Sequence, residues 1–205
     1  TTGLAQLGFV VVCFGNRGGS PYRGRDYHCF GYGNLRDYSL ADNKYGLEQL
    51  MRRYSFIDST KVGIFGHSGG GAMSVAAICT YPDFYTAAVA SSGNYDNTIF
   101  DYGWSEIHHG IKEVVKDGEV SFEFDIPTHM ELAKNLKGHL MLVTGDADNT
   151  VNPANTYRMV SALILAKKDF ELVVLPGQRH GYMGFAKEYY SRKMWQHFTR
   201  YLLDK

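Results

Sequence analysis

Short apolar runs recur along the chain, and stretches with helical periodicity separate them. Each run is almost continuous rather than alternating, which is typical of strands covered on both faces of a parallel sheet. We predict strands over residues 8–14, 61–66, 87–91, 139–144 and 170–175. Because helical stretches alternate with these strands, the pattern predicts a doubly wound, mostly parallel α/β sheet.

Apolar residues three or four positions apart predict four helices, over residues 40–54, 70–80, 153–168 and 186–203. Asn152 can cap the third of these helices, and Pro153 suits its first turn. In the last two helices we expect an inward face formed by Met159, Val160, Leu163, Ile164, Trp195, Phe198 and Leu202. Residues 93–129 have the least regular pattern, and we expect them to form an excursion over one edge of the sheet.

Composition and charge narrow the class of protein. The chain has 205 residues, of which 44% are apolar and 20% are charged, as expected for one globular domain. Its 21 basic and 21 acidic residues balance, so nothing argues for nucleic acid or an anionic membrane surface. No apolar run approaches the roughly 20 residues that span a bilayer. The three cysteines lack CxxC spacing, which favours small buried or half-buried side chains over a zinc site or a disulfide framework.

One glycine-rich stretch lies between a predicted strand and a predicted helix. It reads Gly66-His67-Ser68-Gly69-Gly70, the G-x-S-x-G pattern that places a nucleophilic serine on a sharp turn. We expect Gly66 and Gly70 to relieve a collision between the two sides of this turn. The N–H of Gly69 is expected to point at the same space as the serine hydroxyl, where it can bind a developing oxyanion. A phosphate-binding loop is excluded, because G-x-x-x-x-G-K-[ST] is absent.

A serine nucleophile needs a base and an orienting carboxylate, which on this fold follow in the order serine, acid, histidine. His180 lies just after the last predicted strand in a glycine-flanked loop, so we assign it as the base. Two aspartates, Asp146 and Asp148, follow the preceding strand, and their positions alone favour neither. His67 is adjacent to the serine, and we expect it to point away from the hydroxyl and to pack.

Five stretches of the sequence, three of which contain the residues just described, together resemble the motifs of a single family. They are NRGGSPYRG, FIDSTKVGIFGHSGGG, YPDFYTAAVASSGNYD, TGDADNTVNPANTYRMVSAL and LPGQRHGYMG. Through them nearly the whole chain resembles the catalytic domain of the prolyl oligopeptidase family of serine peptidases, nearest its dipeptidyl-peptidase IV branch. The resemblance implies an α/β-hydrolase fold and cleavage of short peptides, often after proline, through an acyl-enzyme. The family sets its acid three residues before a valine, which selects Asp148 to act with Ser68 and His180.

The resemblance also implies a substrate pocket. Trp104 and Tyr95 fall where the family builds the apolar pocket for the residue before the scissile bond, and a proline ring packs well on aromatic faces. Two departures bear on this preference, since the branch often has an aromatic residue in place of Gly69 and usually an arginine in place of Ile107. Aminopeptidase or acylpeptide-releasing activity is therefore an alternative to cleavage after proline.

Some parts of the family pattern lie outside these 205 residues. The family has a middle strand between those predicted at 8–14 and 61–66, a second oxyanion donor from an upstream tyrosine, and an amino-terminal β-propeller. We therefore expect residues 1–205 to be a partial catalytic domain, with N-terminal strands missing, of a longer polypeptide. The resemblance further favours attachment to the propeller, a homodimer, and a periplasmic or extracellular location.

Three functions stay open on the sequence alone. The leading hypothesis is a serine exopeptidase that acts on short peptides and requires neither a metal ion nor an organic cofactor. A carboxylesterase would use the same fold and the same triad. A non-catalytic interaction domain that keeps the fold is the third, and the retained triad argues against it.

Overall fold

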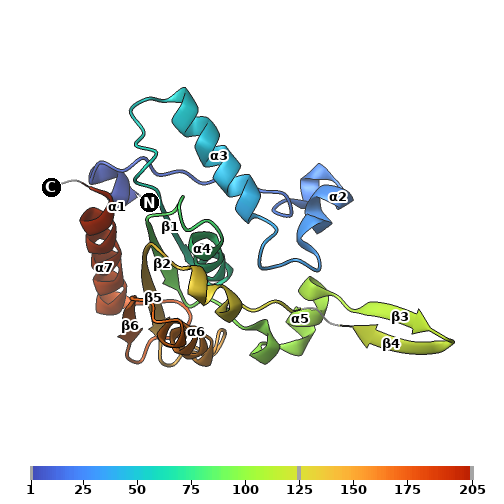
Figure 1. The fold of residues 1–205 in the computed structure, drawn as a ribbon. Helices are drawn as coiled ribbons and strands as arrows, with labels where there is room; N and C mark the ends of the chain where they lie inside the picture. The colour runs from blue at the N-terminus through green and yellow to red at the C-terminus, as the bar shows by residue number, and fades with distance from the viewer. Residues whose placement is uncertain (1, 124–125, 204–205) are drawn as a thin grey trace.

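Four parallel strands form the central sheet of this computed structural model, which describes residues 2–123 and 126–203. The strands lie in the order β1 (Gly63–His67), β2 (Ala87–Ser91), β5 (His139–Gly145) and β6 (Glu171–Leu175) (Figure 1). All three pairings are parallel, so the carboxyl ends of the four strands meet at one edge of the sheet. The predicted parallel α/β arrangement is confirmed, and with it four of the five predicted strands.

Helices cover both faces of this sheet (Figure 1). On one face α4 (Gly69–Thr80) and α6 (Ala154–Leu165) enclose an apolar cluster, and α3 (Leu40–Arg53) packs beside α4. On the other face α7 (Gly184–Leu202) and the short α1 (Thr2–Gln6) enclose a second cluster. Successive residues of β2 enter the two clusters in turn, and the whole of this strand is buried.

The strand predicted over residues 8–14 does not form. Residues 9–14 carry no regular secondary structure, although Phe9 and Val11 pack on the second cluster while Val10 and Val12 are 53% and 40% exposed. The two-residue alternation of a strand is therefore present without its hydrogen bonds. The physical reason is the lack of a neighbour, because among the described residues β1 pairs only with β2.

The predicted helices form, but two of their expected inward residues lie at the surface. Ile164 of α6 is 62% exposed and Trp195 of α7 is 36% exposed. Of the predicted inward face of α6, Met159 and Leu163 are completely buried, both with 0% exposure. Trp195 packs against α1, where a Cβ at Gly3 would lie 2.5 Å from its ring. The cysteine prediction holds only in part, because two of the three thiol side chains are exposed.

Within the predicted excursion over residues 93–129, the described residues at the two ends, such as Tyr95 and His129, are buried, and the middle extends outward. The middle contains α5 (Tyr102–His109) and a hairpin of β3 (Lys112–Lys116) and β4 (Glu119–Glu123), which extends away from the body of the molecule (Figure 1). Above α5 in the view of Figure 1 lies the segment that contains the short α2 (Arg25–His28). The backbone N–H of Gly33 donates to the carbonyl of His108 over 3.2 Å, so this segment and α5 support each other.

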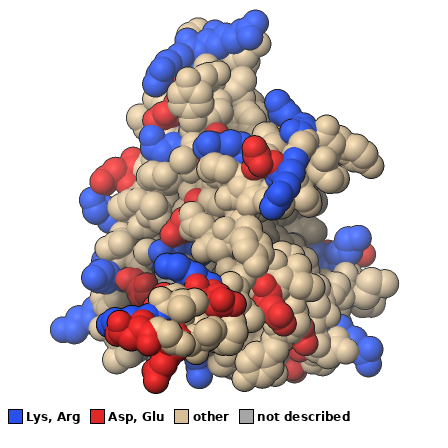
Figure 2. All heavy atoms as spheres, turned by 90° about the vertical axis from the view of Figure 1, so that its right-hand side faces the viewer, with Lys and Arg blue, Asp and Glu red and all other residues tan. Residues whose placement is uncertain are grey.

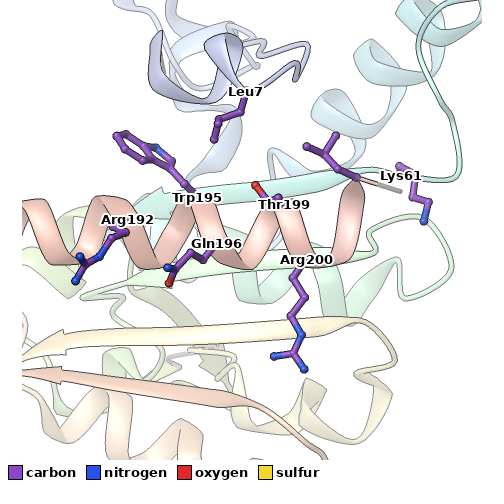
Figure 3. Close-up of a pocket in the computed structure, with 8 residues that line it drawn as sticks. Leu7, Lys61, Arg192, Trp195, Gln196, Thr199 and Arg200 are labelled. Carbon is purple, nitrogen blue, oxygen red and sulfur yellow. The ribbon is translucent and has the colours of Figure 1, made fainter. Parts of the chain in front are cut away.

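The surface offers no large field of one charge on the side that carries the hairpin. Figure 2 shows lysine and arginine at its top and also scattered over the middle and both edges, with acidic side chains among them and mostly in the lower half. Among residues 2–123 and 126–203, no helix combines the length and apolar character needed to cross a membrane. An open groove of about 740 Å³ lies between α1 and α7, lined by Leu7, Trp195, Arg192 and Lys61 among others (Figure 3).

Candidate active site

Ser68 occupies a strained turn between the end of β1 and the first residue of α4. Its backbone has φ of 59° and ψ of −126°, a conformation that residues other than glycine rarely adopt. Two hydrogen bonds hold the turn: Ser68 N donates to Ser91 O over 2.8 Å, and Ala72 N donates to Ser68 O over 3.0 Å. A strained backbone conformation therefore places this hydroxyl at the carboxyl edge of the sheet.

The glycines around Ser68 have distinct roles. A Cβ at Gly66 would lie 2.2 Å from the carbonyl oxygen of Gly70, so Gly66 does relieve the expected collision. A Cβ at Gly70 would meet nothing within 4 Å, so the collision is not symmetric as the sequence led us to expect. Sequence reasoning missed Gly71, where a Cβ would lie 2.5 Å from the carbonyl oxygen of Ser91. Gly71 thus allows α4 to approach β2 closely.

Three side chains from separate loops meet at this edge. The Nε2 atom of His180 lies 2.9 Å from Ser68 Oγ, and its Nδ1 atom lies 2.9 Å from Asp148 Oδ2. These residues follow β1, β5 and β6, so the parallel sheet brings together positions 112 and 32 residues apart in the sequence. The geometry is that of a nucleophile, a base within hydrogen-bond reach of it, and a carboxylate that orients the base.

Asp148 is held as an ionised acceptor. Its side chain is 0% exposed, and its Oδ1 atom accepts hydrogen bonds from the N–H groups of Thr150 and Val151 at 3.0 and 2.9 Å. Burial by itself would raise the pKa of the Asp148 carboxyl, but the hydrogen bonds from His180, Val151 and Thr150 outweigh it and lower the pKa below its ordinary value. A fixed negative charge therefore faces Nδ1 of the imidazole.

Asp146, the other aspartate left open by the sequence, has a different task. Its Oδ1 atom accepts a hydrogen bond from Gly177 N at 2.6 Å, in the loop that leads to the histidine. The same two loops meet again where a Cβ at Gly145 would lie only 2.2 Å from the carbonyl oxygen of Gln178. Asp146 thus ties the acid loop to the base loop, while Asp148 contacts the base itself.

Gly69 is the first residue of α4 and is exposed beside the nucleophile. An N–H group in the first turn of a helix has no intrahelical acceptor, and the helix dipole favours negative charge at this end. A Cβ at Gly69 would meet nothing within 4 Å, so the approach to its N–H is open. Its role as an oxyanion donor stays a prediction that this position supports.

His67 is exposed at the end of β1, and its ring makes more contacts with the site than the packing that we expected. Its Nδ1 atom lies 2.9 Å from Ser91 Oγ, and its ring centroid lies 4.7 Å from that of His180. The ring also meets Tyr182 edge-on at 5.6 Å. No local sequence pattern signals these contacts, because they join residues of β1, β2 and the loop after β6.

The two aromatic residues predicted to line a substrate pocket lie in different surroundings. Tyr95 is 0% exposed and belongs to the apolar cluster beneath α4, so in this structure its ring is a core side chain and not an accessible wall. Trp104 in α5 is half-buried, with its ring stacked on His108 at 4.3 Å and in edge contact with Phe100 at 5.0 Å. A substrate contact by Trp104 stays a prediction.

The sheet topology, the turn at Ser68 and the chain order of the three side chains define an α/β-hydrolase. A model of the prolyl oligopeptidase family matches residues 1–205, and the chain belongs to this family. It is 32% identical over 178 residues to human dipeptidyl peptidase 8, which covers 86% of this chain and 19% of that protein. Prolyl endopeptidase FAP of Bos taurus is 24% identical over 204 residues, covering 97% of this chain and 25% of that protein.

A solved structure agrees with this fold. Dipeptidyl peptidase 4 of Porphyromonas gingivalis matches with a TM-score of 0.79 at 22% identity, over 91% of this chain and 26% of its own. The chain thus spans only about a fifth to a quarter of the length of these three proteins.

Alanine at Gly66 and alanine at Gly70 should have opposite consequences for stability. Gly66→Ala places a methyl group against the backbone of α4 and should lower the free energy of unfolding by about 1–3 kcal/mol. Gly70→Ala adds a methyl group in open space within a helix, so stability should be unchanged or raised by up to about 1 kcal/mol. Urea unfolding of the two variants measures both, and equal destabilisation would contradict the asymmetry.

Proposed function

We propose that this chain carries the catalytic triad of a serine peptidase that hydrolyses short peptides. The observation that supports it best is the continuous hydrogen-bonded series from Ser68 Oγ to His180 and from His180 to Asp148, each step 2.9 Å long. The three side chains follow the chain order serine, acid, histidine, which is the order of the triad on the α/β-hydrolase fold.

In the proposed reaction Ser68 Oγ attacks the carbonyl carbon of the scissile bond while its proton passes to His180 Nε2. The N–H of Gly69 stabilises the negative charge that develops on the carbonyl oxygen. Collapse of the tetrahedral intermediate breaks the C–N bond, and the leaving amine takes the proton from His180. Water then attacks the acyl-enzyme with His180 again as the base, which releases the acid and restores Ser68. Asp148, which is ionised, stabilises the imidazolium formed in each half of the reaction.

For the substrate we favour release of dipeptides from the amino end of peptides. Support comes from the relatives, since human dipeptidyl peptidase 8 and dipeptidyl peptidase 4 of P. gingivalis both carry that activity in their names. The half-buried ring of Trp104 offers an apolar face on which a proline ring before the scissile bond could pack. Cleavage after proline is therefore the preference to test first.

We also propose that residues 1–205 act within a longer polypeptide, with an upstream strand placed beside β1 and an amino-terminal β-propeller that limits access to short peptides. The small share of each relative that the chain spans supports this. So do the single partner of β1 in the described sheet and the strand-like alternation of residues 9–12, which pair with no strand of that sheet. The upstream part would also supply a second oxyanion donor.

Hydrolysis of a set of aminoacyl and dipeptidyl anilides by the full-length protein tests the activity. Ala-Pro and Gly-Pro anilides should be cleaved, and Ser68→Ala should lower kcat by on the order of 10⁶. If the protein turns over a p-nitrophenyl ester but none of the anilides, it is an esterase. If in addition Ser68 does not label with a fluorophosphonate, the catalytic proposal is wrong altogether.

The two aspartates provide a matched comparison. Asp148→Asn replaces the charge that faces the imidazole and should lower kcat by on the order of 10⁴. Asp146→Asn keeps an oxygen that can accept from Gly177 N, so kcat should fall less than about tenfold. Steady-state kinetics of both variants decides the assignment, and a reversed order would identify Asp146 as the acid.

The proposal of a longer polypeptide predicts both a mass and a gain in stability. Intact-mass analysis of the natural protein should give well over the 23.0 kDa of this chain. Extension of the chain upstream to include one further strand should raise its thermal midpoint, because the N–H and C=O groups of β1 gain partners. A natural mass near 23.0 kDa, or an extension without effect on unfolding, would count against it.

A further inference from the structure

A second imidazole lies against the candidate base. The ring of His67 stands at 49° to the ring of His180 with the centroids 4.7 Å apart. His180 is thus constrained on two sides, because Asp148 contacts one of its nitrogens while His67 faces its ring. A ring held in this way has less freedom to rotate out of line with Ser68.

His67 is itself held by a chain of buried hydroxyl groups. Its Nδ1 atom lies 2.9 Å from Ser91 Oγ, which lies 2.8 Å from the hydroxyl of Tyr182. That hydroxyl is also 3.0 Å from Ser92 Oγ. Ser91 and Ser92 are 0% and 1% exposed. Buried polar groups of this kind are retained in a core only when they satisfy one another.

The chain of hydroxyls begins and ends at the same loop. Tyr182 lies two residues after His180, so the loop contacts the network through the Tyr182 hydroxyl at one end and through the ring of His180 at the other. Tyr182 is 8% exposed and packs in the cluster beneath α7. The network therefore fixes the loop that carries the base to the end of β2.

The charge on His67 bears directly on the base. When His180 takes the proton from Ser68 it becomes a cation, and a neutral ring beside it adds no opposing charge. A protonated His67 would place a second positive charge within 5 Å of it, and two like charges in a partly buried site repel.

We propose, on the basis of the peptidase function proposed above, that His67 is a positioning residue that holds His180 in line with Ser68 through the Ser91–Tyr182 hydroxyl network, and that it supports the reaction only while it is uncharged. This role differs from that of Asp148, which contacts the other nitrogen of the base. It also differs from packing, since it depends on the contact of His67 Nδ1 with Ser91 Oγ.

The groups around His67 determine the pKa of its ring, and therefore the pH range in which the ring is uncharged. Burial lowers the pKa of His67 below its ordinary value and His180 lowers it further, while a backbone hydrogen bond at His180 and the charge of Asp148 oppose the shift. Tyr182, from the loop after β6, faces the ring as well, and its own pKa is raised by burial, so it is uncharged. His67 is therefore neutral at neutral pH and gains its charge only as the pH falls.

The test uses the full-length protein and two variants, one that replaces the His67 imidazole and one that removes the partner of its Nδ1 atom. His67→Phe keeps a ring against His180 but removes both nitrogens, and Ser91→Ala removes only the hydroxyl that meets Nδ1. His28→Phe is the matched control, because His28 is an exposed histidine at the end of α2. The measurements are kcat and KM for a dipeptidyl anilide, and the rate of Ser68 labelling by a fluorophosphonate, from about pH 5 to about pH 9.

We expect His67→Phe to lower kcat and the labelling rate by about tenfold or more while KM changes less than about twofold. The double variant with Ser91→Ala should lose no more than His67→Phe alone, since both act through one network. In the parent protein the fall in kcat/KM at acid pH should be steeper than one titrating group allows. In His67→Phe it should fit a single group. His28→Phe should match the parent throughout.

Two results separate this inference from the function on which it rests. If the parent protein labels at Ser68 and cleaves the anilide, but His67→Phe keeps its rates within about twofold and an equally steep acid limb, the inference is wrong and the peptidase stands. If the parent neither labels nor cleaves, both proposals fail. Should His67→Phe not fold, Ser91→Ala alone decides, because an unchanged labelling rate in that variant would overturn the network.

Discussion

The site depends on one hydrogen bond, from the backbone N–H of Ser68 to the carbonyl of Ser91 at 2.8 Å. It joins the turn after β1 to the end of the buried strand β2, and so holds Ser68 in a backbone conformation that it would not otherwise keep. The same carbonyl limits how closely α4 can approach, which is why Gly71 has no side chain to place there. Ser91 of β2 thus contacts the nucleophile Ser68 and limits the position of α4. Its side chain also contacts His67, the residue beside the base.

The other half of the site is built in a different way, because its two loops are fixed to each other. Asp146 accepts from the loop before the base, and Ala147 N donates to the carbonyl of Gln178 over 3.1 Å. Their close approach at Gly145 leaves no room for a side chain. The loop that carries the acid and the loop that carries the base are therefore held to each other by contacts that do not involve Ser68. This explains why sequence spacing within one loop could not distinguish the two aspartates, since the distinction lies in which partner each meets across the gap.

Local pattern and chain order predicted much of this structure, and what they missed depends on contacts between distant segments. The four sheet strands and the positions of Ser68 and His180 follow from apolar runs and from what stands after each run, whereas only the family resemblance selects Asp148 over Asp146. Whether residues 8–14 form a strand depends instead on a neighbour, which no local pattern records. Tyr95 illustrates the same limit, because its place in a motif suggested a pocket wall while the packing beneath α4 buries it completely.

The absent strand at 8–14 and the second oxyanion donor that we propose have one common explanation. Phe9 and Val11 already lie on the apolar cluster beneath α7, so burial of side chains is not what prevents the strand. What the segment lacks is a neighbouring strand for its backbone. Without one, water can satisfy its N–H and C=O groups equally well, so an extended strand is not favoured. A strand inserted beside β1 would provide those partners, and its carboxyl end would emerge at the same edge as Ser68 if it ran parallel to β1. The segment that completes the sheet is then also the one placed to reach the oxyanion.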